Sequence, residues 1–66
     1  MLGENIKAYR VSAGMSQGEL AKRINEILGT NYKYENVKSW ERGTNPKLDV
    51  ISAIASIFDI TEQDLF

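Results

Sequence analysis

Cysteine and histidine are both absent from this chain of 66 residues, and proline and tryptophan occur once each. Without cysteine no disulfide can form, and without either residue we expect no zinc site and no histidine-dependent active site. The chain also has no glycine-rich phosphate loop, and its carboxylates are mostly isolated from one another. These absences predict a protein that is not an enzyme and that uses no metal ion and no cofactor.

Long hydrophobic runs are missing as well. The longest apolar stretch is VISAIASIF, residues 50 to 58, whereas a membrane-spanning helix needs about 20 such residues. No N-terminal stretch has the basic and then apolar pattern of a secretory signal peptide. Together with the lack of cysteine, this pattern predicts one soluble domain over residues 1 to 66, located in the cytoplasm and without membrane contact.

Charge is distributed unevenly along the chain. All eight lysines and arginines lie in residues 1 to 47, together with five glutamates, whereas residues 48 to 66 contain four acidic residues and no basic one. The first segment therefore carries +3 and the second −4, although the net charge is only −1. This asymmetry has two interpretations, a face prepared for an anionic partner or solvated charges placed by chance.

The spacing of apolar residues predicts helices throughout and no strand. The first helix contains Leu2, Ile6, Tyr9 and Val11, and Gly14 is placed to end it. SQGE, residues 16 to 19, has the pattern of a capping box, in which Ser16 caps the second helix and Glu19 completes the box. That helix is predicted to run from Gln17 to Leu28 and to end at Gly29, with an inward face made of Leu20, Ala21, Ile24, Ile27 and Leu28.

The second half of the chain predicts three more helices. A third spans Tyr34 to Arg42 and ends at Gly43. TNP, residues 44 to 46, predicts the start of a fourth helix, with Thr44 or Asn45 as the cap and Pro46 in the first turn. Its apolar stripe consists of Leu48, Ile51, Ile54, Ala55 and Phe58, and Asp59 stands at its end. A capping box of Thr61 and Asp64 predicts a last short helix. The expected fold is an all-α, compact five-helix domain.

The third helix has two different faces. At 100° per residue, Val37 and Trp40 lie on one side and are interpreted as core anchors. The opposite side, which contains Glu35, Ser39 and Arg42, is polar and mixed in charge. Tyr32 and Trp40 could also stack on the rings of a partner, but we favour anchoring in the turn and the core. The outer face is therefore free to contact a partner.

Four segments carry a family resemblance, and together they cover nearly the whole chain: LGENIKAYR, MSQGELAKRI, VKSWERGTNPKLD and IASIFDITEQDLF. In this order they resemble the repressor and Cro type of helix-turn-helix DNA-binding domain found in phage and bacterial regulators. The resemblance implies five helices, with the second and third forming the helix-turn-helix and the third lying in the major groove. Between Ser16 and Trp40 the chain is longer than the commonest form, which we interpret as an extra helical turn at NEIL and a longer loop at GTNYK.

The resemblance also implies a set of site residues. Candidates for base contacts are Tyr34, Glu35, Asn36 and Ser39. Candidates for contacts with the DNA backbone are Gln17, Lys33, Lys38, Arg42, Thr44, Asn45 and Lys47. Arg10 and Glu41 match a family pair that forms a structural salt bridge between the first and third helices. Each contact candidate has an alternative interpretation as a solvated residue or a helix cap, and for Asn45 we favour the cap.

Two functions from different classes follow. The first is a sequence-specific DNA-binding transcription regulator, either a short Cro-like protein or the N-terminal domain of a longer repressor, which binds a near-palindromic double-stranded operator as a homodimer. The second is a protein-binding module on the same scaffold, such as an antirepressor that binds a partner regulator protein instead of DNA. Glu35 and the acidic net charge favour the second function. Gln17, Arg42 and the lysines favour the first, which is our preferred hypothesis.

Overall fold

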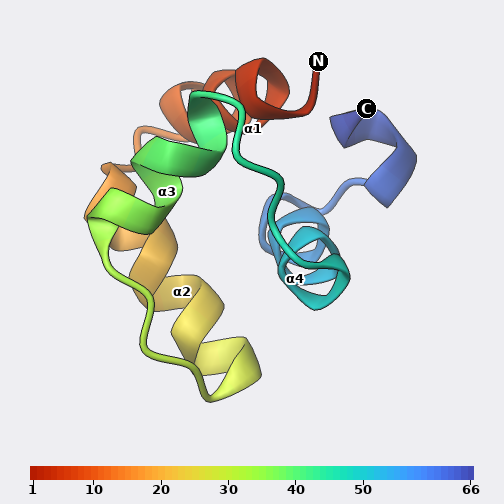
Figure 1. Ribbon diagram of the computed structural model, residues 1–66. Coiled ribbons are helices and arrows are strands. Elements are labelled where there is room, and N and C mark those ends of the chain that lie inside the picture. The colour runs from red at the N-terminus through yellow and green to blue at the C-terminus, as the bar shows by residue number, and fades with distance from the viewer.

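The computed structural model describes residues 1–66 and contains four α-helices and one short 3₁₀ helix (Figure 1). The elements are α1 Leu2–Ser12, α2 Gln17–Leu28, α3 Tyr34–Glu41, α4 Leu48–Phe58 and η1 Glu62–Leu65. The prediction of an all-α fold is confirmed, but the fifth element is a 3₁₀ turn and not an α-helix. Its backbone bonds join residues three apart, and four residues are too few for a ladder of i to i+4 bonds.

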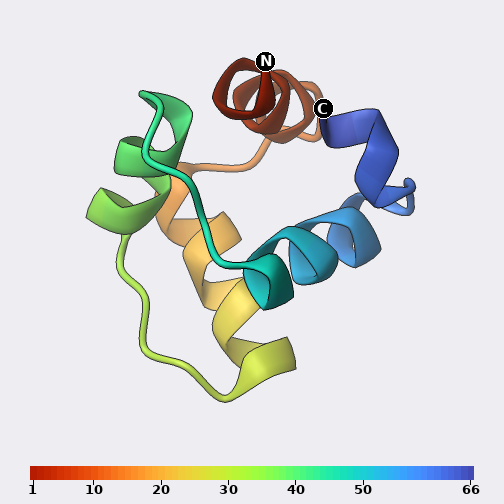
Figure 2. The same cartoon turned by 45° about the vertical axis from the view of Figure 1, so that its right-hand side comes forward.

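The helices wrap around one centre. In both views α1 lies across one end of α3, α2 packs against α3 and α4, and η1 returns to α1, so that the two termini are neighbours (Figures 1 and 2). The Asn5 amide in α1 joins the two ends of the chain by donating a hydrogen bond of 2.9 Å to the Leu65 carbonyl in η1. No helix combines the length and the apolar character that a membrane span requires.

Every element contributes to a single hydrophobic core. Its twelve buried residues are Ile6, Leu20, Ala21, Ile24, Val37, Trp40, Val50, Ile51, Ala53, Ile54, Ala55 and Leu65. Two aromatic pairs border it: the rings of Tyr9 and Phe58 are stacked at 5.9 Å, and the rings of Tyr32 and Trp40 meet edge to face at 5.1 Å. The helical spacing of apolar residues therefore predicted most of the core correctly.

Local signals predicted several of the helix ends correctly. The Ser16 hydroxyl accepts a bond of 3.0 Å from the Glu19 N–H, as a cap requires. The Glu19 carboxylate does not complete the predicted capping box, and its nearest partner is Arg23 at 4.0 Å. Gly29 ends α2 with φ 68°, and Asp59 ends α4 with φ 56°, the only positive φ outside glycine. The Thr61 and Asp64 capping box is also present.

Three apolar residues that the periodic pattern placed inside are exposed. Val11 is 57% exposed, Ile27 53% and Leu48 80%. Val11 and Ile27 lie in the last turn of their helices, and Leu48 is the first residue of α4. Periodicity identifies a face of a helix but not how far the neighbouring helix reaches along it, so these terminal positions were predicted wrongly.

The predicted start of α4 was also wrong. The helix begins later, at Leu48, with Lys47 as its cap residue and no side-chain cap bond. The Thr44 hydroxyl accepts a bond of 2.9 Å from the Ser39 hydroxyl, and the Thr44 N–H donates to the Ser39 carbonyl at 3.1 Å. Pro46 is buried ahead of the helix. Thr44 is therefore bonded to α3, and Pro46 is buried before the helix begins. Because α4 begins only after Lys47, neither Thr44 nor Asn45 caps it.

Gly3 permits a close approach between two helices. A Cβ atom at this position would lie 2.6 Å from the Trp40 carbonyl oxygen and 2.8 Å from that of Glu41. The first turn of α1 thus rests directly on the last carbonyls of α3, where the positive end of one helix dipole meets the negative end of the other. At Gly18 in α2, by contrast, a Cβ would meet nothing closer than the Tyr34 Cβ at 3.9 Å.

Substituting these two glycines gives opposite predictions. Gly3→Ala should destabilise the fold by about 1–3 kcal/mol, because two backbone carbonyls must move to admit the methyl group. Gly18→Ala should stabilise it by about 0.5–1 kcal/mol, because alanine is the better helix former and the site is open. Chemical denaturation of both variants checks this, and equal effects would show that α1 does not contact α3 as described.

Candidate nucleic-acid interface

The two faces of α3 differ sharply in burial. Val37 is fully buried and Trp40 is 6% exposed, so both anchor the helix in the core as the sequence predicted. Tyr34, Glu35 and Lys38 are exposed. The outer face of α3 is thus a polar surface on a helix whose inner face is fixed.

A buried ion pair fixes the last turn of α3. Arg10 in α1 donates two hydrogen bonds to the Glu41 carboxylate, from Nε to Oε2 at 2.6 Å and from Nη2 to Oε1 at 3.1 Å. The side chains are only 11% and 4% exposed. Arg10 Nη1 also donates to the Met15 carbonyl at 2.8 Å, and Gln17 Nε2 donates to Glu41 Oε1 at 3.0 Å. This cluster joins α1, the start of α2 and the end of α3.

Gln17, a predicted backbone contact, therefore has a second role. It is the first residue of α2, and its amide is oriented by the bond to Glu41. An amide nitrogen carries two N–H groups, so the second remains available for a phosphate oxygen. The N-terminus of α2 adds a partial positive charge at the same place.

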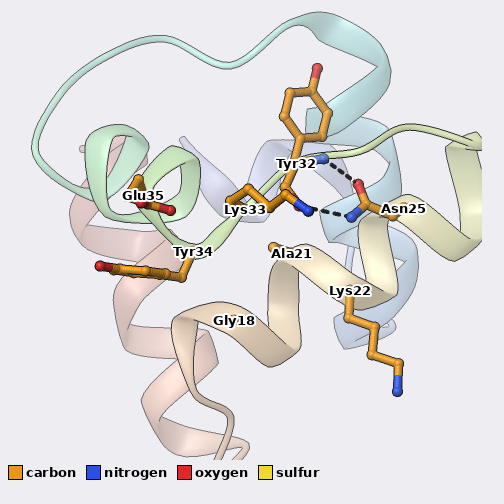
Figure 3. A pocket seen from close by; sticks show the side chains of 8 residues that line it. All are labelled: Gly18, Ala21, Lys22, Asn25, Tyr32, Lys33, Tyr34 and Glu35. Atoms are coloured by element: carbon orange, nitrogen blue, oxygen red, sulfur yellow. Dashed lines mark hydrogen bonds between the residues drawn. The ribbon is translucent and has the colours of Figure 1, made fainter.

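The loop between α2 and α3 is held by two asparagine side chains. Asn25 Nδ2 donates to the Tyr32 carbonyl at 2.9 Å, and its Oδ1 accepts from the Tyr32 N–H at 2.8 Å (Figure 3). The same Oδ1 accepts from the Thr30 hydroxyl at 2.9 Å. Asn36 Oδ1 accepts from the Lys33 N–H at 2.9 Å. Backbone bonds join only the two ends of this loop to the helices. The side-chain amides thus replace the missing backbone pairs and set where α3 begins.

The structure divides the predicted base contacts into two groups. Tyr34 and Glu35, in the first turn of α3, are exposed, and their side chains make no hydrogen bond within the protein. Asn36 uses its Oδ1 in the loop, which leaves its Nδ2 donor free. Ser39 is half-buried and donates to Thr44, which connects α3 to the following segment. Tyr34 and Glu35 are consequently the side chains best placed to contact a partner.

Several of the predicted backbone contacts lie on or beside α3, whereas Gln17 begins α2 and Lys47 caps α4. Lys33 precedes the helix, and its ammonium is 3.3 Å from Asn31 Oδ1. Lys38, Arg42, Asn45 and Lys47 are exposed, and none belongs to an ion pair. Thr44 is exposed but bonded to Ser39. Lys38 lies in the last turn of α3 and Arg42 caps its end, whereas Lys47 stands at the start of α4.

Two residues beside this surface were not predicted from the sequence. Asn25 was assigned no role, although three hydrogen bonds make it the main support of the loop. Lys22 was not a candidate, yet it lies on α2 facing the same hollow as Lys33 and Tyr34. The only feature of the sequence that indicated a role for Asn25 was its position, one helical turn after the inward-facing Ala21.

The sequence model of the helix-turn-helix family matches residues 6–65. The match begins in α1, ends in η1 and includes both helices joined by the asparagine-held loop. The chain therefore belongs to the helix-turn-helix family, and it is a DNA-binding domain of the Cro and repressor type. No curated protein and no solved structure matched the chain.

Because the ion pair is buried, variants of Arg10 and Glu41 should differ in their free energies of unfolding. Glu41→Ala should destabilise the domain by about 3–5 kcal/mol, because it leaves the Arg10 guanidinium buried without its carboxylate. Arg10→Met should also destabilise, because Glu41 keeps only Gln17 as a partner. The double variant Arg10→Met/Glu41→Leu should recover most of the loss, since no buried charge remains.

The exposed pair of Glu19 and Arg23 is the matched control for these measurements. Both side chains are 50% exposed at 4.0 Å, so Arg23→Ala should change the free energy of unfolding by less than about 0.5 kcal/mol. Thermal melting of the four variants is the measurement. A Glu41→Ala protein that melts like the Arg23→Ala protein would contradict the buried cluster.

We predict that two asparagines, Asn25 and Asn31, differ in how much they stabilise the loop between α2 and α3. Asn25→Ala should cost about 1–3 kcal/mol, because it leaves the half-buried Tyr32 N–H and carbonyl unpaired. Asn31→Ala removes only an exposed contact with Lys33 and should stay within about 0.5 kcal/mol of the parent. Amide hydrogen exchange at Tyr32 should accelerate in the first variant only. Unchanged exchange there would show that Asn25 does not hold the loop.

Proposed function

We propose that this protein is a sequence-specific DNA-binding transcription regulator that acts as a repressor and places α3 in the major groove of an operator. The observation that carries the proposal is the free first turn of α3, where Tyr34 and Glu35 are exposed and unpaired on a helix fixed at both ends. A helix presented in this way fits the width of the major groove, and its N-terminal side chains reach base edges. The proposed activity is binding, without catalysis.

Contacts with phosphates would hold the domain in register. Lys38 and Arg42 are free cations on α3 and at its end, and Lys47 is a free cation at the start of α4. Gln17 has a second N–H next to Glu41. Such contacts supply affinity that does not depend on sequence and that weakens with salt. Glu35 supports specificity, because a carboxylate accepts a hydrogen bond from the amino group of cytosine and is repelled by phosphates.

The dimensions of the domain support binding as a homodimer. The protein extends 25 × 22 × 19 Å, whereas half-sites of a palindromic operator are about 34–36 Å apart. One copy therefore spans one half-site, and recognition of two successive major grooves requires a second copy. Repression at such an operator would take place in the cytoplasm, where we expect the protein to be located.

Binding to another protein is the second candidate function. The net charge of −1 and the carboxylate at the centre of the exposed face are the observations that favour it. In that case Glu35 would pair with a basic residue of a partner regulator.

Selection from a pool of randomised duplexes tests the proposal. The parent protein should enrich a near-palindromic motif, and Glu35→Gln should change the preferred base at one position of each half-site by about 1–3 kcal/mol. Glu26→Gln carries the same charge change on an exposed residue of α2 and should leave the motif unaltered. If the parent enriches no motif, DNA recognition fails and the protein-binding function takes its place.

A further inference from the structure

Asn25 holds both ends of the connection between α2 and α3. Its backbone carbonyl accepts a bond of 2.8 Å from the Gly29 N–H, the bond that ends α2. Its side chain bonds both backbone groups of Tyr32, the N–H at 2.8 Å and the carbonyl at 2.9 Å (Figure 3). One residue therefore determines where the chain leaves α2 and how it approaches α3.

The lengthened part of α2 supplies this residue. Asn25 is the first residue of NEIL, residues 25 to 28, the predicted extra turn of α2. It follows Ile24, which is fully buried, and lies one turn after Ala21, which is 2% exposed. Because these two neighbours fix α2 in the core, the Asn25 side chain gives the loop a fixed point of attachment.

The middle of the loop has no other attachment through its backbone. No bond between backbone groups involves Thr30, Asn31 or Tyr32. The Thr30 hydroxyl also donates to Asn25 Oδ1, at 2.9 Å. The position of this segment therefore depends on one side-chain amide, which acts as a donor and as an acceptor at the same time.

Tyr32 carries this constraint into α3. Its ring meets the ring of Trp40 edge to face at 5.1 Å, and Trp40 belongs to the buried face of α3. Tyr34, the first residue of α3, follows only two positions after Tyr32. Tyr32 is thus bonded to α2 by its backbone and packed on α3 by its ring, so a shift of Tyr32 would move the first turn of α3.

The length of α3 amplifies such a movement. Glu41 fixes the last turn through the buried ion pair, so a rotation about that end moves the first turn furthest. The eight residues of the helix span about 12 Å, and a rotation of about 5° would move Tyr34 and Glu35 by about 1 Å. Recognition through hydrogen bonds requires placement within about 0.5 Å.

From these contacts we propose that Asn25 is a positioning residue for base recognition: through Tyr32 it holds the first turn of α3 at the angle at which Tyr34 and Glu35 reach base edges. Asn25 acts through the backbone of the loop, without a contact to the DNA. The inference rests on the proposed function and gives the lengthened α2 and its loop a part in specificity. Loss of the amide changes which sequence is bound, as well as the stability of the domain.

The ratio of two affinities tests this role. One duplex is the sequence that the parent protein enriches, and the other carries one base change at the position that Glu35→Gln alters. Asn25→Leu keeps the approximate volume of the side chain and removes both bonding groups. It should lower the ratio by about fivefold or more, the lower limit for one specific base contact. Its affinity for a random-sequence duplex should stay close to that of the parent, because phosphate contacts do not depend on sequence.

Two control variants separate positioning from stability. Thr30→Val removes only the hydroxyl bond to Asn25 and leaves both bonds to Tyr32. Ile54→Val removes one methyl group from a fully buried side chain of α4 and lowers stability outside the loop. Both variants should keep the ratio of the parent, because a smaller folded fraction weakens binding to the two duplexes by the same factor. A common loss of affinity in Asn25→Leu, with the ratio unchanged, would overturn the inference.

Asn25→Gln provides a second variant if Asn25→Leu does not fold. It keeps the donor and the acceptor but places them one methylene group further from α2, so Tyr32 must move or lose its bonds. The ratio should therefore change in this variant as well, and an unchanged ratio would contradict the role of Asn25.

Residual dipolar couplings measure the angle between the helices without DNA. In Asn25→Leu the N–H vectors of α3 should rotate relative to those of α2, whereas in Thr30→Val they should keep the parent's angle. An unchanged angle in both variants would refute the inference and leave the proposed function standing. A parent protein that prefers no sequence would refute the proposed function, and the inference with it.

Discussion

The buried ion pair between Arg10 and Glu41 is the constraint on which the arrangement of the helices depends. Burial of two charges is costly, and the pair persists because nearly every polar atom is used: the guanidinium also bonds the Met15 carbonyl, and the carboxylate also bonds Gln17. Since these groups come from α1, the turn after it, α2 and α3, none of these three helices can shift without breaking a bond to a buried charge. The pair therefore sets the orientation of the recognition helix.

A second set of contacts fixes the other end of the recognition helix. With eight residues, α3 is too short to be stable in isolation. Its start is defined by the Asn25 and Asn36 amides, and Tyr32 packs edge to face on Trp40. The close approach at Gly3 adds a backbone contact at its end. The protein thus holds a short polar helix rigidly at both ends and leaves the outer face unpaired, which is the arrangement that groove recognition requires.

Charge placement explains how an acidic chain fits a DNA-binding fold. The C-terminal segment from Leu48 onward carries only negative charge, and it forms α4 and η1, which lie away from α3 in both views (Figures 1 and 2). The free cations Lys38 and Arg42 lie on α3 and at its end. Local potential, more than net charge, governs the approach of a polyanion. The uneven distribution seen in the sequence therefore separates the acidic α4 and η1 from the free cations of α3.

By itself the sequence determined the class of fold, the limits of α2, and the turns at Gly29 and Asp59, because caps and left-handed turns depend on bonds within a few residues. The family resemblance predicted that Arg10 pairs with Glu41. Periodicity alone does not predict this pair, because 31 positions separate the two residues. Only the tertiary structure decided that Leu48 is exposed, that Thr44 bonds Ser39 instead of capping α4, and that Asn25 holds the loop. Each of these outcomes depends on which segment of chain lies opposite a side chain, and that is settled when the helices pack.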